Sequence, residues 1–386
     1  MSAKRKKIVI LGPAPPYRGG NAMFIAYLYN ALLENYDVVL LNYSLLYPSF
    51  LFPGATQFDL SKKSVKNVKS ERIINSINPF NWLQVARRIR REQADLVVFD
   101  WWNPFFGPCH RVISSLIKRR YSGKILFLTE NFISHEARTI DRLLTRIGLC
   151  NASCFMALSD TVERELSALA AGRKIYRSEL PMFDYSLAGS GFDRSAERKR
   201  LGLTDNDDVL LFFGYVRKYK GLDILLEAMP EIVRRVPRAK LVVAGEFYDD
   251  KVAYESIVSS NGTAGIVQFW DKFIPNEDVG RFFAAADVVV QPYRSATQSG
   301  ILNTSYSFGV PAVVTRVGGL EQYVDDGITG IVSGPESPEE IAAGVERFFI
   351  LKQSTDFAAN IRARVSRSGF NNIASVFEEI LRDCED

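Results

Sequence analysis

The feature that most constrains this chain is an alternation of short apolar runs with gaps long enough for a helix. Strands buried on both faces read as continuous apolar runs, and parallel strands need helical crossovers between them. The alternation therefore predicts an α/β fold with parallel sheets covered by helices. It occurs twice, with expected strands at 8–11, 38–41, 96–99, 125–128 and 154–157, and then at 209–213, 240–244, 266–269, 287–291 and 311–314.

The length of the chain predicts two domains. A chain of 386 residues exceeds what one ordinary core supports, and two domains of about 150–200 residues are expected. Gly, Ser and Ala interrupt the periodicity at residues 182–195, which indicates the linker. We therefore expect an N-terminal domain over 1–190, a second domain over 191–368, and a C-terminal amphipathic helix within 369–386 that is able to cross back to the N-terminal domain.

Composition excludes several classes of protein. A hydrophobic share of 47% and a charged share of 24% are typical of a globular chain. The sequence contains no run of about 18 apolar residues, so no membrane span is predicted. Ile8–Leu11 is too short for the core of a signal peptide. Cys150 and Cys154 lie in an apolar stretch, and the four cysteines have no metal-like spacing, so we expect buried thiols in a reducing cytoplasm.

Charge is distributed unevenly along the chain. Residues 1–190 carry 26 Lys and Arg against 15 Asp and Glu, whereas the remainder carries 22 against 29. The N-terminal half is therefore the part that would attract an anionic surface or acceptor.

The basic region of the N-terminal half also contains many apolar and aromatic residues. Tyr43–Phe52 is rich in Leu, Tyr and Phe, five cations follow between Lys62 and Arg72, and Trp82, Leu83 and four arginines share a predicted helix. This composition suits the surface of an anionic bilayer. The alternative is a solvated helix face beside an ordinary packed loop. Nucleic acid is not expected, because the chain has no recognition helix, RNP-type motif or zinc site.

The stretch Phe212–Gly221 predicts a phosphate site. An apolar run ends at Gly214, the cations Arg217 and Lys220 follow in a short turn, and an apolar-periodic helix begins at Gly221. Backbone N–H groups at a helix N-terminus point toward an anion, and Arg and Lys neutralise its charge. The alternative is a solvated loop that happens to be basic.

A second stretch in the same half has the same design. The apolar run 288–291 leads to Thr297, Gln298, Ser299 and Gly300 at a helix start, which offers hydroxyl, amide and backbone donors in one place. Two anion sites on one sheet indicate a diphosphate ligand.

The N-terminal half carries further candidate residues after its strands. A Gly-rich loop containing Gly19, Gly20 and Asn21 leads into a helix, which permits close approach by a ligand or simply makes a tight turn. Aromatic residues at 101–106 follow Asp100, and they either shape an acceptor pocket or fill the core. The histidines at 110 and 135 follow strand ends, although a lone histidine is more often structural.

Together these motifs resemble the GT-B glycosyltransferases of the large retaining family 4. The resemblance covers nearly the whole chain and is densest over 212–331. The motifs that match are Gly19-Gly20-Asn21, the pair Arg217 and Lys220, the loop-to-helix stretch 298–301, and Gly309-Val310-Pro311-Ala312-Val313-Val314. The resemblance implies two Rossmann-like doubly wound parallel-sheet domains facing a central cleft, with the acceptor bound by the first and the nucleotide sugar by the second.

Some residues depart from the pattern of the family. Its Glu-x7-Glu pair would fall at Ala296 and Thr304, and Gln322 stands where a further acid is usual. The chain is similar to a subgroup that has Thr-Gln-Ser-Gly in place of the first acid. Glu130 stands where the N-terminal domain of the family has a histidine, with His135 five residues later.

The resemblance implies a role for each matched residue. Arg217 and Lys220 would stabilise the departing nucleoside diphosphate, and Glu130 would orient sugar hydroxyl groups. Trp270 or Phe273 would lie near the base, and Thr304 near the ribose. The implied substrate-binding residues are Gly19, Gly20, Asn21, Asn131, His135, Trp270, Phe273, Gln298, Ser299, Gly300, Ile301 and Thr304.

The predicted activity is transfer of a sugar from a nucleotide diphosphate donor to a glycolipid or glycan acceptor, with retention and without a metal or other cofactor. We expect the protein in the cytoplasm or peripherally on the inner face of the membrane. Two alternatives share the scaffold. One is a GT-B nucleotide-sugar epimerase, and the other is a partner protein that has lost its chemistry along with the missing acids.

Overall fold

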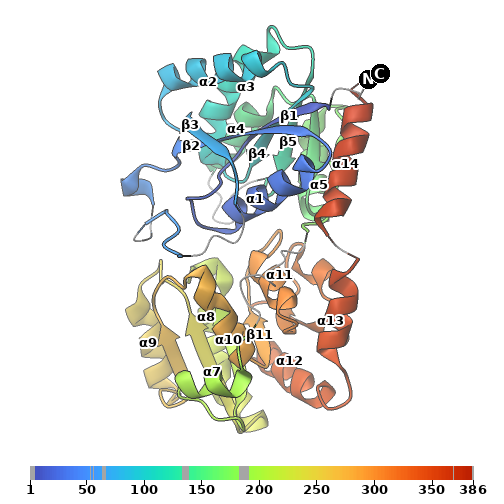
Figure 1. The fold of residues 1–386 in the computed structure, drawn as a ribbon. Helices are drawn as coiled ribbons and strands as arrows, with labels where there is room; N and C mark the ends of the chain where they lie inside the picture. Colours follow the sequence, from blue (N-terminus) through green and yellow to red (C-terminus); the bar gives the residue numbers. More distant parts are fainter. Residues whose placement is uncertain are drawn as a thin grey trace. The chain divides into compact units, whose positions relative to one another are not determined.

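The fold was analysed in a computed structural model that describes residues 5–52, 54, 56–62, 67–132, 139–181, 191–367 and 369–384. The chain divides into two compact units, which Figure 1 colours along the sequence. Unit 1 contains the described residues within Met1–Asp59, Lys66–Pro181 and Gly369–Asp386. Unit 2 contains those within Leu60–Val65 and Met182–Ser368. The predicted linker falls mostly on 182–190, outside the described residues.

Unit 1 is built on a sheet of seven parallel strands in the order β3-β2-β1-β4-β5-β6-β7. The order reverses between β1 and β4, as in a doubly wound sheet. The strands are β1 (Lys7–Leu11), β2 (Asp37–Leu45), β3 (Ser70–Asn75), β4 (Leu96–Trp101), β5 (Lys124–Thr129), β6 (Cys154–Ala157) and β7 (Ile175–Arg177). The helices are α1 (Gly20–Leu33), α2 (Pro79–Glu92), α3 (Gly107–Lys118), α4 (Thr139–Leu149), α5 (Asp160–Ala170) and α14 (Phe370–Arg382), with short 3-10 turns η1 (Ser49–Leu51) and η2 (Pro104–Phe106).

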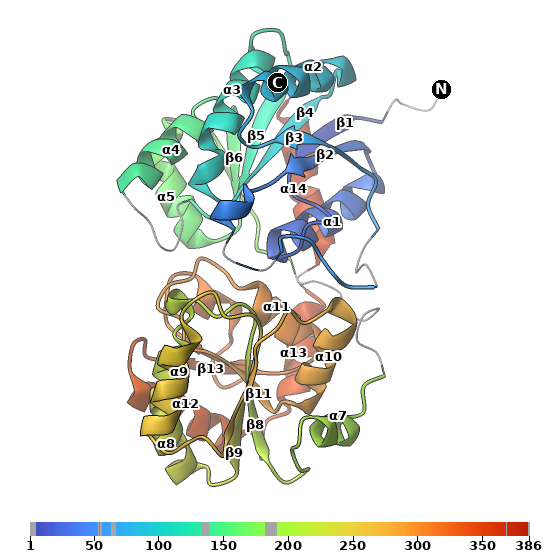
Figure 2. The ribbon, with the colours of Figure 1, turned by 90° about the vertical axis from the view of Figure 1, so that its left-hand side faces the viewer.

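Helices cover both faces of this sheet. Figure 2 shows α3, α4 and α5 on one side of the strands and α1 with α14 on the other. The core between the sheet and the first group contains stacked Phe99 and Phe127, whose ring centroids are 4.9 Å apart. Because parallel strands are buried on both faces, nearly all of β1, β4, β5 and β6 is inaccessible to water.

The helix α14 packs on α1, although 336 residues separate their ends in sequence. The rings of Tyr27 and Phe370 stack at 5.2 Å, and Ile373, Phe377 and Ile380 are fully buried. At the far end of α14, Asp383 accepts hydrogen bonds from Lys174 Nζ at 2.7 Å and from the hydroxyl group of Tyr176 at 2.6 Å. Figure 1 shows this last helix, in red, lying beside α1.

Unit 2 is built on a second parallel sheet, in the order β10-β9-β8-β11-β12-β13. The strands are β8 (Asp208–Phe213), β9 (Ala239–Ala244), β10 (Val267–Trp270), β11 (Val288–Gln291), β12 (Ala312–Thr315) and β13 (Gly330–Ser333). The helices are α7 (Arg194–Arg200), α8 (Leu222–Arg235), α9 (Lys251–Ser260), α10 (Asn276–Ala285), α11 (Gly300–Ser307), α12 (Pro338–Leu351) and α13 (Phe357–Val365), with 3-10 turns η3 (Lys218–Lys220) and η4 (Leu320–Tyr323).

The predicted α/β class with two parallel sheets is confirmed. All ten expected strands are present within a few residues of their predicted bounds. Three further strands, β3, β7 and β13, were not expected, and each lies at or beside an edge of its sheet. Edge strands meet fewer helices, so they need no long apolar run.

Candidate functional site

The loop after β8 is fixed by pairing with the loop after β9. The backbone N–H of Val216 donates to Glu246 O at 2.8 Å, and that of Tyr248 donates to Val216 O at 3.0 Å. The chain then turns through η3, where the N–H of Lys220 donates to Arg217 O at 2.8 Å. Residues 217–220 are therefore held at the carboxyl edge of the unit 2 sheet, where open α/β sheets bind ligands.

Two cations in this loop have no counterion. Lys220 is only 6% exposed, Arg217 is half-buried, and neither forms an ion pair with any described residue. Their side chains lie against aromatic rings instead, with Arg217 over Tyr248 at 5.1 Å and Lys220 Nζ 5.8 Å from the Tyr293 ring. Burial, with the charge of Arg217 nearby, lowers the pKa of Lys220 to about 7. A buried ammonium without a partner indicates a site for an anion.

The loop after β11 supplies backbone donors. Ser299 is the N-cap of α11, and its side chain accepts from Leu302 N at 3.2 Å. Tyr293 forms a side-chain hydrogen bond with Ser299 and so fixes the start of the helix. The N–H groups of Gly300 and Ile301 have no acceptor among the described residues. A Cβ at Gly300 would meet nothing within 4 Å, so the helix N-terminus is open to a ligand.

The two loops are tied together by polar contacts. The guanidinium of Arg294 forms two hydrogen bonds with the carboxylate of Asp223, at 2.7 and 2.9 Å, and its backbone N–H donates to Tyr219 O at 2.7 Å. Gly221 has φ +67°, and a Cβ there would lie 2.0 Å from Pro292 O. Only glycine allows this approach, so Gly221 fixes the spacing of the loops.

The cation loop and the helix start meet over Gly214. A Cβ at that glycine would lie 3.1 Å from both Lys220 Nζ and Ile301 Cδ1. The structure thus brings Lys220 together with the N-terminus of α11, as the two sequence motifs suggested. Gln298 lies in the same turn and is half-buried, and its Oε1 has no hydrogen-bond partner among the described residues.

Other predicted residues of unit 2 occupy different surroundings. The hydroxyl group of Thr304 donates to Gly300 O at 2.9 Å within α11 and is buried. Trp270 ends the edge strand β10, and its ring packs on Phe282 at 5.7 Å with Lys272 Nζ 5.1 Å from its centroid. Phe273 follows in the loop after β10. The predicted contacts of these residues with a ribose or a base remain predictions.

Unit 1 has a polar cluster at its own carboxyl edge. Glu130 follows β5, and its backbone N–H donates to Trp101 O at 2.9 Å. The carboxyl group of Glu130 forms side-chain hydrogen bonds with Asn21, in the first turn of α1, and with Asp100 on β4. A Cβ at Gly19 or Gly20 would meet nothing within 4 Å, so the helix start is open. The predicted residues Asn21 and Glu130 are therefore in contact.

Other candidates of unit 1 are structural or lie outside the description. Trp101 is fully buried in the core, and Trp102 Nε1 donates to the hydroxyl group of Tyr47 at 3.0 Å. His110 is buried beside Tyr43, and burial lowers its pKa to about 3, so it is a neutral core residue. Asn131 is half-buried, and His135 is outside the described residues.

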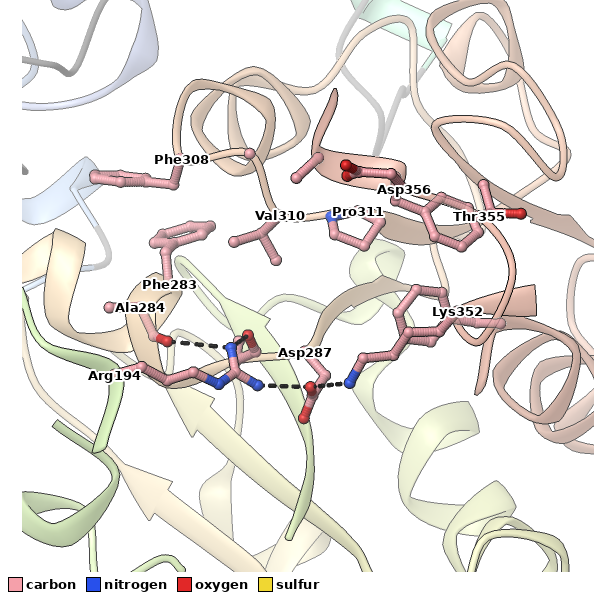
Figure 3. Close-up of a pocket in the computed structure, with 15 residues that line it drawn as sticks. Arg194, Phe283, Ala284, Asp287, Phe308, Val310, Pro311, Lys352, Thr355 and Asp356 are labelled. Atoms are coloured by element: carbon pink, nitrogen blue, oxygen red, sulfur yellow. Dashed lines mark hydrogen bonds and ion pairs between the residues drawn. The ribbon is translucent and has the colours of Figure 1, made fainter. Parts of the chain in front are cut away.

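A pocket of about 480 Å³ lies at the opposite, amino edge of the unit 2 sheet. Figure 3 shows Arg194 and Lys352 on either side of Asp287, which precedes β11. Asp287 also accepts from Arg198 Nη2 at 2.7 Å and from Val209 N at 2.8 Å. The single carboxylate of Asp287 thus pairs with all three cations, and we regard this cluster as structural. The sequence offered one signal for it, an acid directly before an apolar strand.

No group of three or more His, Cys, Asp or Glu within the described ranges could hold a metal ion. Among the helices described, none is long and apolar enough to cross a bilayer.

Comparisons with known proteins agree with this geometry. Residues 207–349, which contain the unit 2 site, match the family model of the glycosyl transferases group 1. The chain is 31% identical over 180 residues to a D-inositol 3-phosphate glycosyltransferase of Segniliparus rotundus, covering 46% of this chain and 39% of that protein. A Corynebacterium kroppenstedtii enzyme of the same name is 24% identical over 319 residues, covering 72% of this chain and 70% of the relative. The chain thus spans about two fifths of the length of the first of these relatives.

Solved structures match over nearly the whole chain. Anabaena HepE in complex with UDP and glucose has a TM-score of 0.75 at 17% identity, covering 98% of this chain and all of HepE. Sucrose-phosphate synthase from Thermosynechococcus elongatus has a TM-score of 0.74 at 16% identity, covering 98% of this chain and 99% of that protein. The fold is therefore that of the GT-B glycosyltransferases, with two Rossmann-like domains, as the sequence resemblance implied.

Proposed function

We propose that this protein is a retaining GT-B glycosyltransferase of family 4 that uses a nucleotide diphosphate sugar. The observation that carries the proposal is the buried Lys220 ammonium, which has no counterion and lies beside the open N-terminus of α11. Together with Arg217 it forms a site for two linked phosphates. The match of residues 207–349 to glycosyl transferases and the UDP bound in the structure of HepE support this proposal.

The reaction transfers the sugar from phosphate to a hydroxyl group. The bond between the anomeric carbon and the β-phosphate oxygen breaks, and the acceptor oxygen forms a new bond on the same face of the sugar. The acceptor proton passes to the departing phosphate oxygen, so no protein base is needed. Negative charge grows on the diphosphate as the bond breaks, and Arg217, Lys220 and the N–H groups of 300–301 stabilise it most in the transition state. These groups supply the positive charge, so the scheme requires no metal.

The acceptor we propose is a lipid-linked or polysaccharide glycan at a cytoplasmic membrane surface. Phe80 and Leu83 on α2 are 80% and 39% exposed, and Arg87 and Arg91 on the same face form no ion pair with any described residue. The helices α2, α3 with its next two residues, and α4 carry ten cations against two acids. Apolar side chains beside free cations suit an anionic bilayer, and unit 1 would bind it peripherally.

Binding and turnover test the proposed activity. Calorimetric titration with UDP and GDP should show binding that is lost in Arg217→Ala, and a thermal-shift screen of nucleotide sugars should identify the donor. Once the donor is known, NMR of the glycoside product should show the same anomeric configuration as in the donor. Absence of binding by every nucleotide would contradict the proposal, and conversion of the donor without any acceptor would identify an epimerase instead.

Vesicle sedimentation tests the membrane surface. The protein should sediment with vesicles containing phosphatidylglycerol and remain in solution with phosphatidylcholine alone. The double variant Phe80→Asp, Leu83→Asp should reduce binding at least about tenfold, since it removes buried apolar area and adds repulsion. Val252→Asp on α9, a position 67% exposed in unit 2, is the matched control. Equal binding of the vesicles by both variants would contradict the proposal that this surface of unit 1 contacts the membrane.

A further inference from the structure

Two carboxyl groups meet inside unit 1 without a cation. Asp100 is fully buried, Glu130 is 5% exposed, and neither forms an ion pair with any described residue. Apart from the contact with Glu130, neither oxygen of Asp100 has a hydrogen-bond partner among the described residues, and Glu130 Oε1 has no further partner among them. Two adjacent carboxylates cannot both be ionised in such a place, because burial and mutual repulsion both penalise the second charge.

The fold places this pair under the start of α1. Asp100 is at the carboxyl end of β4 and faces Gly12. A Cβ added at Gly12 would lie 3.2 Å from the Cβ of Asp100. Helix α1 has Gly19 as its N-cap and no acid in its first turn, so no side chain of that turn compensates the positive end of its dipole. The pair therefore lies where one negative charge is favoured and a second is not.

We propose that Asp100 and Glu130 share one proton, and that protonated Asp100 positions an ionised Glu130 to accept a hydrogen bond from a sugar hydroxyl group. Asn21 hydrogen-bonds to Glu130 and stabilises its charged form, whereas Asp100 has no partner apart from Glu130 among the described residues, so the proton belongs on Asp100. Burial raises the pKa of both groups, and the neighbouring acid raises that of Asp100 further. The role of Glu130 rests on the proposed function, and the shared proton does not.

Other titratable groups around the pair are neutral near pH 7. The hydroxyl group of Tyr43 forms a hydrogen bond with His110 Nε2, and Cys109 lies in the same core. Burial raises the pKa of the Tyr43 phenol and of the Cys109 thiol, and it lowers that of His110 to about 3. None of the three therefore supplies the missing positive charge. Glu130 Oε1 is buried and has no hydrogen-bond partner among the described residues, and the start of α1 beside it is open at Gly19 and Gly20.

Infrared spectroscopy tests the proton without any substrate. Wild-type protein at pH 7 should show the carbonyl band of a protonated carboxylic acid, shifted in heavy water and absent from Asp100→Asn. Absence of this band from the wild type, or its persistence in Asp100→Asn, would overturn the proposal. Because the first of these results needs no variant, the proposal stays testable if Asp100→Asn does not fold.

Stability against pH is the second test. Asp100 has a raised pKa in the folded state, so its contribution to stability is full below its unfolded pKa and is lost as pH rises toward the folded value. Asp100→Asn stays neutral, and its melting temperature should rise relative to wild type by about 2–4 °C per pH unit above about pH 5. Asp95→Asn, which changes an exposed acid beside the same strand, is the control variant. If the melting temperatures of Asp100→Asn and of the wild type changed with pH in parallel, the proposal would be overturned.

Kinetics test the link to substrate. The kcat of Asp100→Asn at pH 7 should stay within about tenfold of the wild-type value, since the amide also donates to Glu130. We expect the kcat of the wild type to fall at alkaline pH, and this fall should be absent from Asp100→Asn. Glu130→Gln should lower kcat by at least about a hundredfold. If the infrared band is present but Glu130→Gln is fully active, the role of Glu130 is wrong and the shared proton stands. If no variant or wild type has activity with any donor, the proposed function fails independently.

Discussion

Lys220 reaches across its loop to Gly214, so that its ammonium nitrogen lies 3.1 Å from where a Cβ of that glycine would be. The same position is 3.1 Å from Ile301 Cδ1, and Gly214 has φ +96°. A side chain at 214 would therefore both strain the backbone and separate the cation from the helix start.

We expect Gly214→Ala to weaken UDP binding at least about tenfold. The backbone strain alone costs of order 1–3 kcal/mol, and the added methyl group also displaces Lys220. Gly202→Ala is a matched control, because Gly202 has φ +70° and a Cβ there would meet nothing within 4 Å. Calorimetry should show intact binding in the control. An equal loss in both variants would mean that strain, and not the position of the cation, explains the effect.

Removal of either unpaired cation should slow the reaction. Arg217→Ala and Lys220→Ala should each lower kcat by at least about a hundredfold, which is the scale of losing one group that stabilises developing charge. Lys218→Ala is the control, since Lys218 lies in the same turn but is exposed. Steady-state kinetics with the identified donor would measure the difference. Unchanged turnover in Lys220→Ala would remove this residue from the mechanism.

Binding of a diphosphate should take up a proton. The pKa of Lys220 is lowered to about 7 by burial, so at pH 8–9 most free protein has a neutral amine there. An anion beside it raises the pKa again, and the amine becomes charged on binding. Calorimetry of UDP binding in buffers of different ionisation enthalpy should report uptake approaching one proton, and Lys220→Met should show none. Uptake of equal size in the variant would place the titrating group elsewhere.

The same lowered pKa affects the free protein. Between about pH 7 and pH 10 the unfolded chain holds a proton on Lys220 that the folded protein lacks. Stability therefore rises with pH through this range on account of Lys220, by up to about 1.4 kcal/mol per pH unit. Urea unfolding of Lys220→Met should lack this rise, and an unchanged pH dependence would contradict the prediction.

Asp287 should be required for folding of unit 2. Its side chain is 2% exposed and pairs with Arg198, which is 3% exposed, so Asp287→Asn leaves a buried cation uncompensated. Breaking such a pair costs about 3–5 kcal/mol, and urea unfolding would measure it. Asp326→Asn, whose pair with Arg347 is 43–47% exposed on both sides, should cost about 0–1 kcal/mol. Similar losses in the two variants would refute a structural role specific to Asp287.

The central strands could be predicted because burial on both faces demands apolar runs. β3 could not, since Ser70–Asn75 begins with polar and charged residues and has a neighbour on one side only. β7 has three residues, too few for a periodic signal. The turn that carries Arg217 and Lys220 was predictable from local spacing along the chain. The contact of Asp100 with Glu130 was not, because it depends on which strands are neighbours in the sheet.

Residue type alone could not decide between the two alternatives given for the aromatic residues after Asp100. Trp101 follows a strand as a ligand-binding aromatic would, yet it is fully buried, and its ring lies where any Cβ at Gly148 would be, 2.4 Å away. The pairing of Arg294 with Asp223, 71 residues earlier, has no signal in the sequence and is seen only in the three-dimensional structure.

The packing of α14 on α1 has a consequence for synthesis of the chain. Ile373, Phe377 and Ile380 fill the interior of unit 1, yet a ribosome makes them after the whole of unit 2. Unit 1 begins first and is completed last, and the side of α1 that packs on α14 stays uncovered while unit 2 emerges. Expression of residues 5–181 alone would expose the side of α1 that packs on α14.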